Sequence, residues 1–187
     1  MRIVGGEHKG RIIDVGRDFN ARPTTDFARE ALFNILSNHF DFTEVRFLDL
    51  FSGSGSISFE CCSRGCREID LVEINIRFVQ QILKVASKMN MTGIHPIHMD
   101  VFRFLKLCRK QYDLIFADPP YDLEEREKIP LLIFDNNWLA DDGWFIMEHD
   151  KRINFKDHPF FYEERQYGKI HFTFFSKPEV ESDEKQG

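Results

Sequence analysis

The chain has 187 residues, of which 42% are hydrophobic and 30% charged, and its formal net charge at pH 7 is −6. This length and composition indicate one globular domain with a substantial core. The net negative charge argues against a protein that coats nucleic acid without regard to sequence. No stretch resembles a signal peptide or approaches the ~20 apolar residues of a membrane span, so we expect a cytoplasmic protein.

The charge is distributed unevenly along the chain. Residues 1–29 contain six basic and four acidic side chains, whereas residues 179–187 contain four acidic and one basic. We therefore expect a polyanion to approach the N-terminal end of the protein. The acidic composition predicts a disordered tail over residues 178–187.

Residues 1–20 are predicted to form a small β-hairpin extension. Two β-prone runs, Arg2–Val4 and Arg11–Val15, are separated by Gly5-Gly6 and Lys9-Gly10. The basic side chains predict either an arm that faces RNA or a solvated hairpin that covers an edge of the core. The charges alone leave both interpretations open.

An amphipathic helix is predicted over residues 27–37, because apolar side chains recur there at helical spacing. Thr24, Thr25 or Asp26 can cap its first turn. Capping does not explain why Arg22 and Arg29 flank the same helix start, where they could hold a carboxylate or a phosphate.

A glycine-rich turn follows a predicted strand over residues 46–50. Gly53 and Gly55 permit a tight turn and a close approach of a ligand to the start of the next helix. Ser58 stands where a dinucleotide-binding pattern has its third glycine, and no Lys-Ser or Lys-Thr pair of a P-loop follows. The turn alone is therefore weak evidence for any one ligand.

Acidic residues follow the next two predicted strands, residues 68–72 and 94–98. Glu73 lies 18 positions after Gly55, close to the spacing at which an acid accepts the ribose hydroxyls of a bound nucleoside. The alternative for Glu73 is an acid at the start of a helix. Asp100 either only caps the helix that follows it or also accepts the amine of an adenine.

The motif Asp118-Pro119-Pro120-Tyr121 ends a fourth buried strand, residues 114–117. The two prolines lack backbone N–H groups, so strand pairing stops there. Ligands of open α/β sheets bind at this carboxyl end, which makes Asp118 and Tyr121 candidates for holding a flat base that carries an amine. The alternative is an ordinary turn after a strand.

The alternation of strands and helices predicts an α/β domain over residues 21–177, a three-layer sandwich with a mostly parallel seven-stranded sheet. The other predicted elements are helices ending near residue 64 and covering 75–89, 101–107 and 129–134, a strand over 144–148, and a closing antiparallel hairpin of 160–167 and 169–175. Cys62 and Cys66 are one helical turn apart without a second ligand pair, so no metal site is expected.

Together these motifs resemble the RsmD family of Rossmann-like, S-adenosylmethionine-dependent class I methyltransferases. The matching segments are R-I-V-G-G-x-x-K-G-R at 2–11, R-P-T-T-D-x-x-R-E-A-L-F-N at 22–34, D-L-F-S-G-S-G at 49–55, V-E-I-N at 72–75, D-P-P-Y at 118–121 and W-L-A-D-D-G at 138–143. The chain departs from the family pattern at Ser58, usually glycine, and at Cys61-Cys62, where small residues such as alanine are expected.

The resemblance implies methylation of the N2 amine of a guanine in small-subunit (16S) ribosomal RNA. We further expect a cytoplasmic monomer. Because the enzyme is net acidic, we expect it to meet this RNA in a partly assembled small subunit, where ribosomal proteins present the target loop. The residues assigned to S-adenosylmethionine by matching position are Arg22, Thr24, Thr25, Asp49, Phe51, Gly53, Gly55, Glu73, Ile74, Asp100, Val101 and Asp118. Those expected to contact RNA are Arg2, Lys9, Arg11 and Arg29.

Within the implied cofactor site, Asp49 and the two glycines surround the methionine part, Glu73 binds the ribose, and Asp100 binds the adenine. For the chemistry, Asp118 and the carbonyl of Pro119 are expected to accept N–H bonds of the target amine and direct its lone pair at the methyl group. Tyr121 is expected to stack on the splayed base.

Three other functions are compatible with parts of the pattern. A DNA adenine-N6 or cytosine-N4 methyltransferase shares D-P-P-Y, but no segment is left over for a target-recognition region. An RNA-binding assembly factor without catalysis would not need an intact glycine turn, Glu73 and Asp118. An NAD-binding oxidoreductase lacks the full glycine pattern.

Overall fold

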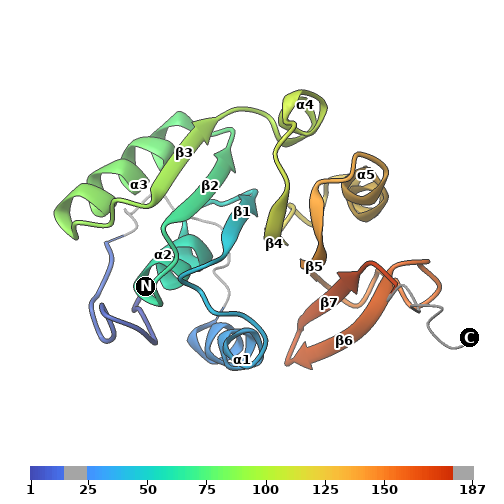
Figure 1. Cartoon of the computed structure of the whole chain (residues 1–187), viewed down its shortest axis with the longest axis horizontal. Coiled ribbons are helices and arrows are strands. Elements are labelled where there is room, and N and C mark those ends of the chain that lie inside the picture. Colours follow the sequence, from blue (N-terminus) through green and yellow to red (C-terminus); the bar gives the residue numbers. More distant parts are fainter. Residues whose placement is uncertain (15–24, 179–187) are drawn as a thin grey trace, which may run out of the picture.

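The protein, seen in a computed structural model that describes residues 1–14 and 25–178, is built around one seven-stranded sheet (Figure 1). The strands are β1 (Arg46–Leu50), β2 (Glu68–Glu73), β3 (Ile94–His98), β4 (Tyr112–Ala117), β5 (Leu139–His149), β6 (Phe161–Tyr167) and β7 (Ile170–Ser176). Their order across the sheet is β3-β2-β1-β4-β5-β7-β6. Strands β1 to β5 pair in parallel, whereas β7 is antiparallel to β5 and β6. The predicted mostly parallel sheet with a closing hairpin is confirmed.

Helices cover both faces of this sheet. They are α1 (Asp26–Ser37), α2 (Ser56–Ser63), α3 (Ile76–Lys88), α4 (Val101–Leu107), α5 (Ile129–Asp135) and the short 3-10 helix η1 (Arg126–Lys128). Helices α1 to α3 pack on one face, and α4 and α5 on the other (Figure 1). The predicted three-layer sandwich is therefore confirmed. Over residues 1–14 and 25–178, no helix is long and apolar enough to cross a bilayer.

Strand β1 shows how alternating side chains supply two separate cores. Phe47 packs with the core of α1 to α3, whereas Leu48 and Leu50 belong to the core of α4 and α5. Because side chains two positions apart in a strand share a face, Asp49 projects on the same side as Phe47. This polar residue thus lies within an otherwise apolar layer.

Strand β5 begins at Leu139, well before the predicted start at Trp144. The Asp-Asp-Gly sequence between them is typical of a turn, which is why the early half of the strand was not expected. In the sheet, Leu139 pairs with Tyr112, and the register shifts after that pair. A Cβ at Gly143 would lie 2.9 Å from the carbonyl oxygen of Asp113, so the irregular pairing requires glycine.

The N-terminal segment packs on the main domain. Arg2 and Ile12 form an antiparallel bridge, and Ile3 and Ile13 are buried with 0% and 2% exposure in the core of α1 to α3. Only this part of the predicted hairpin can be compared, because residues 15–24 lie outside the described residues. The same holds for the predicted acidic tail after residue 178.

Candidate active site

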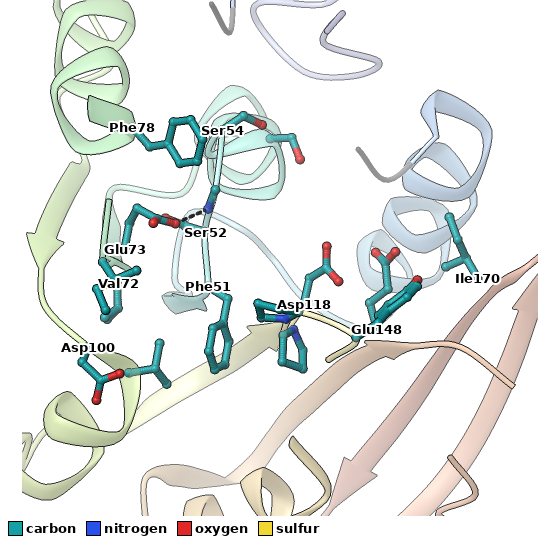
Figure 2. Close-up of a pocket in the computed structure, with 17 residues that line it drawn as sticks. Phe51, Ser52, Ser54, Val72, Glu73, Phe78, Asp100, Asp118, Glu148 and Ile170 are labelled. Carbon is teal, nitrogen blue, oxygen red and sulfur yellow. Dashed lines mark hydrogen bonds between the residues drawn. The ribbon is translucent and has the colours of Figure 1, made fainter. Parts of the chain in front are cut away.

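A cavity of about 440 Å³ opens at the carboxyl edge of strands β1 to β5 (Figure 2). Most of the residues predicted to form the site lie in its wall. They are Phe51, Gly53, Glu73, Ile74, Asp100, Val101, Asp118, Pro119 and Tyr121. Five strand ends contribute to the wall, because the carboxyl ends of parallel strands meet at one edge of the sheet.

Other predicted residues are placed differently. Asp49 and Gly55 lie outside the wall itself. The hydroxyl of Thr25 accepts the backbone N–H of Ala28 at 3.1 Å and caps α1, as one of the predicted capping alternatives requires. Arg22 and Thr24 lie outside the described residues.

The turn between β1 and α2 has a left-handed backbone at three positions. The φ angle is 61° at Phe51, 51° at Gly53 and 74° at Gly55. Glycine adopts this conformation readily, whereas Phe51 is strained by about 1–3 kcal/mol. A Cβ at Gly55 would also lie 3.2 Å from Ile82. The turn thereby holds both the Phe51 ring and the Gly53 backbone at the cavity.

Glu73 connects the end of β2 to this turn. Its carboxylate accepts the backbone N–H of Gly53 at 2.8 Å on one oxygen and that of Asn75 at 2.7 Å on the other. Burial raises the pKa of Glu73, while the backbone donors lower it. A carboxylate has about four acceptor sites, so Glu73 is held in place by backbone donors and can still accept a hydroxyl group of a ligand.

Asp49 accepts a hydrogen bond from Ser58, the residue that departs from the family pattern. The Ser58 hydroxyl donates to Asp49 Oδ2 at 2.6 Å, and the two residues are 0% and 2% exposed. Burial raises the pKa of Asp49 to about 7, although the bond from Ser58 lowers it. A glycine at position 58 would leave this buried carboxyl without that donor.

Three carboxyl groups converge where β1, β4 and β5 reach the cavity. Ala117 and Met147 are register partners that face α4 and α5. Asp118 and Glu148, one residue further on, therefore face the other side, where Asp49 also lies. Figure 2 shows the side chains of Asp118 and Glu148 next to one another. Burial raises the pKa of Asp118 well above its usual range, and the charges of Glu148 and Asp49 raise it further.

Glu148 is a residue that the sequence reasoning missed. It is 3% exposed and lines the cavity beside Asp118 and Tyr121. The available signal was its place at the end of the predicted strand over residues 144–148. The rule that singled out Glu73, an acid at the carboxyl end of a parallel strand, applies equally to Glu148.

Asp100 begins α4 at the opposite end of the cavity. Its Oδ1 accepts the backbone N–H of Arg103 at 2.9 Å, so the predicted cap is confirmed. The same side chain lines the cavity, next to the buried Val101. Asp100 is therefore positioned by its capping bond and still borders the space available to a ligand.

Two cationic side chains lie near the ring of Tyr121. The guanidinium carbons of Arg126 and Arg152 lie 5.8 and 5.9 Å from its ring centroid. Arg152 also donates to the Tyr121 carbonyl at 3.3 Å and forms an ion pair with Asp150. These contacts fix the loop after β4 against the loop after β5, with the aromatic ring at the cavity wall.

The prediction that Arg29 contacts RNA is wrong. Its side chain is fully buried, and Nη2 donates to the Arg2 carbonyl at 2.6 Å and to Asp26 at 2.7 Å. Arg29 therefore fastens the N-terminal segment to α1. Arg2, Lys9 and Arg11 are exposed, and their contact with RNA stays a prediction.

The four cysteines do not form a disulfide. Cys61, Cys62 and Cys66 are buried, and burial raises the pKa of Cys66 to about 11. In the described part of the chain, no group of three or more His, Cys, Asp or Glu side chains is arranged to hold a metal ion.

The sheet order, the glycine turn after β1 and the acids after the following strands define a Rossmann-like methyltransferase. The family model with the description Conserved hypothetical protein 95 matches residues 1–176. The chain belongs to this family, which is the RsmD family that its motifs resemble.

Relatives with known names and structures agree with this assignment. Ribosomal RNA small subunit methyltransferase D of Buchnera aphidicola subsp. Baizongia pistaciae is 31% identical over 179 residues, which cover 94% of this chain and 91% of that protein. The protein of the same name from Escherichia coli K12 is 31% identical over 80% of this chain and 75% of its own. The solved structure of yhhF from Escherichia coli has a TM-score of 0.83 and 26% identity, covering 95% of this chain and 99% of that one.

Proposed function

We propose that this protein transfers a methyl group from S-adenosylmethionine to the N2 amine of a guanine in 16S ribosomal RNA. The observation that carries the proposal is the place of Asp118 in the cavity. Asp118 lies between two halves of the cavity. The first half is bordered by β1, β2 and β3, and the second by the loop that contains Tyr121 and by β5. A methyl donor in the first half and a base in the second would meet at this carboxylate.

The residues of the first half fit S-adenosylmethionine. Phe51, Val72 and Phe78 offer apolar surface for an adenine ring, while Glu73 and Asp100 offer acceptors for ribose hydroxyls and for the adenine amine. The cofactor supplies a methyl group already activated by a positively charged sulfur. Asp118 lines the cavity, and Asp49 lies behind the wall but close enough to raise the pKa of Asp118. These two carboxyl groups would stabilise the positive charge on the sulfur and the methionine ammonium.

In the proposed reaction the protein mainly positions the two partners. Asp118, in its ionised form, accepts an N–H of the guanine amine, orients the nitrogen lone pair and compensates the positive charge that develops on the nitrogen. A bound cation beside Asp118 lowers its pKa, so binding of the cofactor favours the carboxylate. The Pro119 carbonyl is a second acceptor, and Tyr121 offers a ring on which the base stacks.

The names of the relatives support ribosomal RNA as the substrate, and an acidic enzyme is expected to meet that RNA in the cytoplasm on a partly assembled small subunit. A monomer suffices for the reaction, because all the residues named lie in one chain.

The deciding experiment identifies the methylated nucleoside. The protein is incubated with labelled S-adenosylmethionine and with partly assembled small subunits, naked 16S ribosomal RNA or DNA, and the products are digested to nucleosides. We expect N2-methylguanosine from the ribosomal substrates. N6-methyladenine or N4-methylcytosine from DNA would show a DNA methyltransferase, and no transfer to any substrate despite cofactor binding would show an assembly factor without catalysis.

A further inference from the structure

Glu148 is the one carboxylate of the cavity wall that belongs to β5. Strand order places the ends of β3, β2, β1, β4 and β5 side by side along the cavity, so Asp100, Glu73, Asp118 and Glu148 follow one another in that sequence. Apart from Asp118, the proposed cofactor residues in the cavity wall lie at the ends of β1 to β3 or in the loops and helices that follow them. Glu148 lies beyond Asp118, on the side away from them.

The neighbours of Glu148 mark that end of the cavity as the place of the acceptor base. Tyr121, from the loop after β4, and Ile170, at the start of β7, line the cavity with it. An aromatic ring and an apolar side chain suit the faces of a flat heterocycle, and a buried carboxylate suits N–H groups on its edge. Glu148 is 3% exposed, so a polar ligand group that met it there without offering a donor would be strongly disfavoured.

We infer that Glu148 accepts the N1–H of the target guanine while Asp118 accepts its N2 amine, and that Glu148 thereby selects guanine over adenine. This inference rests on the proposed function. The two donors are adjacent on the Watson–Crick edge of guanine, and the two carboxylates are adjacent in the cavity (Figure 2). One base edge can therefore bridge both acceptors.

Bases with a different edge are rejected by the same arrangement. Adenine has an unprotonated N1 beside its N6 amine, and cytosine has an unprotonated N3 beside its N4 amine. Either base that offered its amine to Asp118 would turn a lone pair towards the Glu148 carboxylate, leaving two acceptors facing each other without a proton. Discrimination of this kind is large, because a site built for a hydrogen bond penalises a ligand that lacks it.

The electrostatics of the cavity support a bridging role. Glu148 is among the charges that raise the pKa of Asp118, so the two carboxyl groups repel each other when both are ionised. N–H donors placed between them relieve that repulsion. A guanine edge supplies these donors, whereas an adenine edge supplies them to Asp118 alone.

The test uses 2-aminopurine, which keeps the 2-amine of guanine but has an unprotonated N1. Small subunits are reconstituted on 16S ribosomal RNA that carries guanosine or 2-aminopurine at the methylated nucleotide. The parent enzyme is expected to show a kcat/KM roughly 10- to 100-fold lower for 2-aminopurine. In Glu148→Met the guanosine rate should fall, and the two substrates should differ by no more than about threefold, because neither gains a bond at this position.

Two controls separate recognition from folding. Glu148→Gln keeps an acceptor oxygen, so it should keep part of the preference for guanosine. Glu163→Gln makes the same chemical change on β6, where Glu163 pairs with Arg165 at 2.6 Å, and should retain the full preference. Cofactor binding measured by calorimetry should stay within about threefold of the parent in all three variants.

The outcomes distinguish this inference from the proposed function. If the parent forms N2-methylguanosine and Glu148→Met slows both substrates equally, Glu148 does not read N1–H and the inference fails alone. If the parent modifies adenine or no nucleoside at all, the proposed function fails and the role of Glu148 fails with it. Loss of the guanosine preference in Glu148→Met, with binding of the cofactor retained, supports both the role of Glu148 and the proposed function.

Discussion

Replacement of Ser58 by alanine should destabilise the protein in a manner that depends on pH. The substitution removes the hydroxyl that donates to Asp49 Oδ2 at 2.6 Å between two residues that are 0% and 2% exposed. A hydrogen bond to a charged group contributes about 1.5–3 kcal/mol, and one to a neutral group about 0.5–1.5 kcal/mol. The higher helix propensity of alanine offsets about 0.5 kcal/mol of the loss in unfolding free energy.

The pH dependence follows from the titration of Asp49. Its pKa is about 7 in the folded protein, against an ordinary value of 3.8. The folded state thus binds this proton more tightly, so the stability due to the neutral carboxyl is complete below pH 3.8 and is lost as the pH rises through about 7. Because the Ser58 bond favours the charged form, its removal raises the folded-state pKa further and extends the loss to higher pH.

Urea unfolding followed by circular dichroism at pH about 5.5 and about 8.5 measures this effect. We expect Ser58→Ala to lower the unfolding free energy by about 1–2.5 kcal/mol at the higher pH and by at most about 1 kcal/mol at the lower. Ser63→Ala is the matched control on the same helix, since the Ser63 hydroxyl donates to the Gly5 carbonyl at 2.6 Å and accepts the His8 backbone N–H at 2.9 Å. The partners of Ser63 are uncharged backbone groups, so Ser63→Ala should lower the unfolding free energy by the same amount at both pH values. Equal losses for Ser58→Ala at the two pH values would refute the reasoning.

Four further predictions concern the cavity and the N-terminal segment. Asp118→Ala should reduce methyl transfer by about 10²- to 10⁴-fold, while calorimetry finds cofactor affinity lowered by no more than about tenfold; transfer at the parental rate would contradict the role of Asp118. Glu73→Gln should weaken S-adenosylmethionine binding by about tenfold or more, measured in the same titration, and unchanged affinity would place the ribose elsewhere. Arg29→Met should lower the unfolding free energy by about 2–4 kcal/mol, because the Arg2 carbonyl and Asp26 lose a buried donor. The double change of Arg2 and Arg11 to alanine should instead leave the unfolding free energy within about 0.5 kcal/mol of the parent. The same double change should weaken RNA binding in a salt-dependent way.

Local sequence patterns were sufficient for most of the elements and for most of the cavity. A strand such as β4 ends where two prolines remove backbone donors, and α4 begins where Asp100 caps it, so both boundaries depend on neighbouring residues alone. Parallel strands then bring their carboxyl ends to one edge whatever the details of packing. Gly53, Glu73 and Asp118 could therefore be predicted to share a site from chain order alone.

Contacts between distant parts of the chain decided the rest. The pairing of Ala117 with Met147 places Glu148 beside Asp118, and packing of α2 on β1 brings Ser58 to Asp49. Arg29 is charged and close to other basic residues in the sequence, yet the N-terminal segment covers it. The sequence by itself thus determined which residues stand at the ends of the strands, because strand ends are set locally. Only the tertiary structure decided which carboxyls meet, what supports them and which charges are buried, because these depend on register and on packing between residues far apart in the chain.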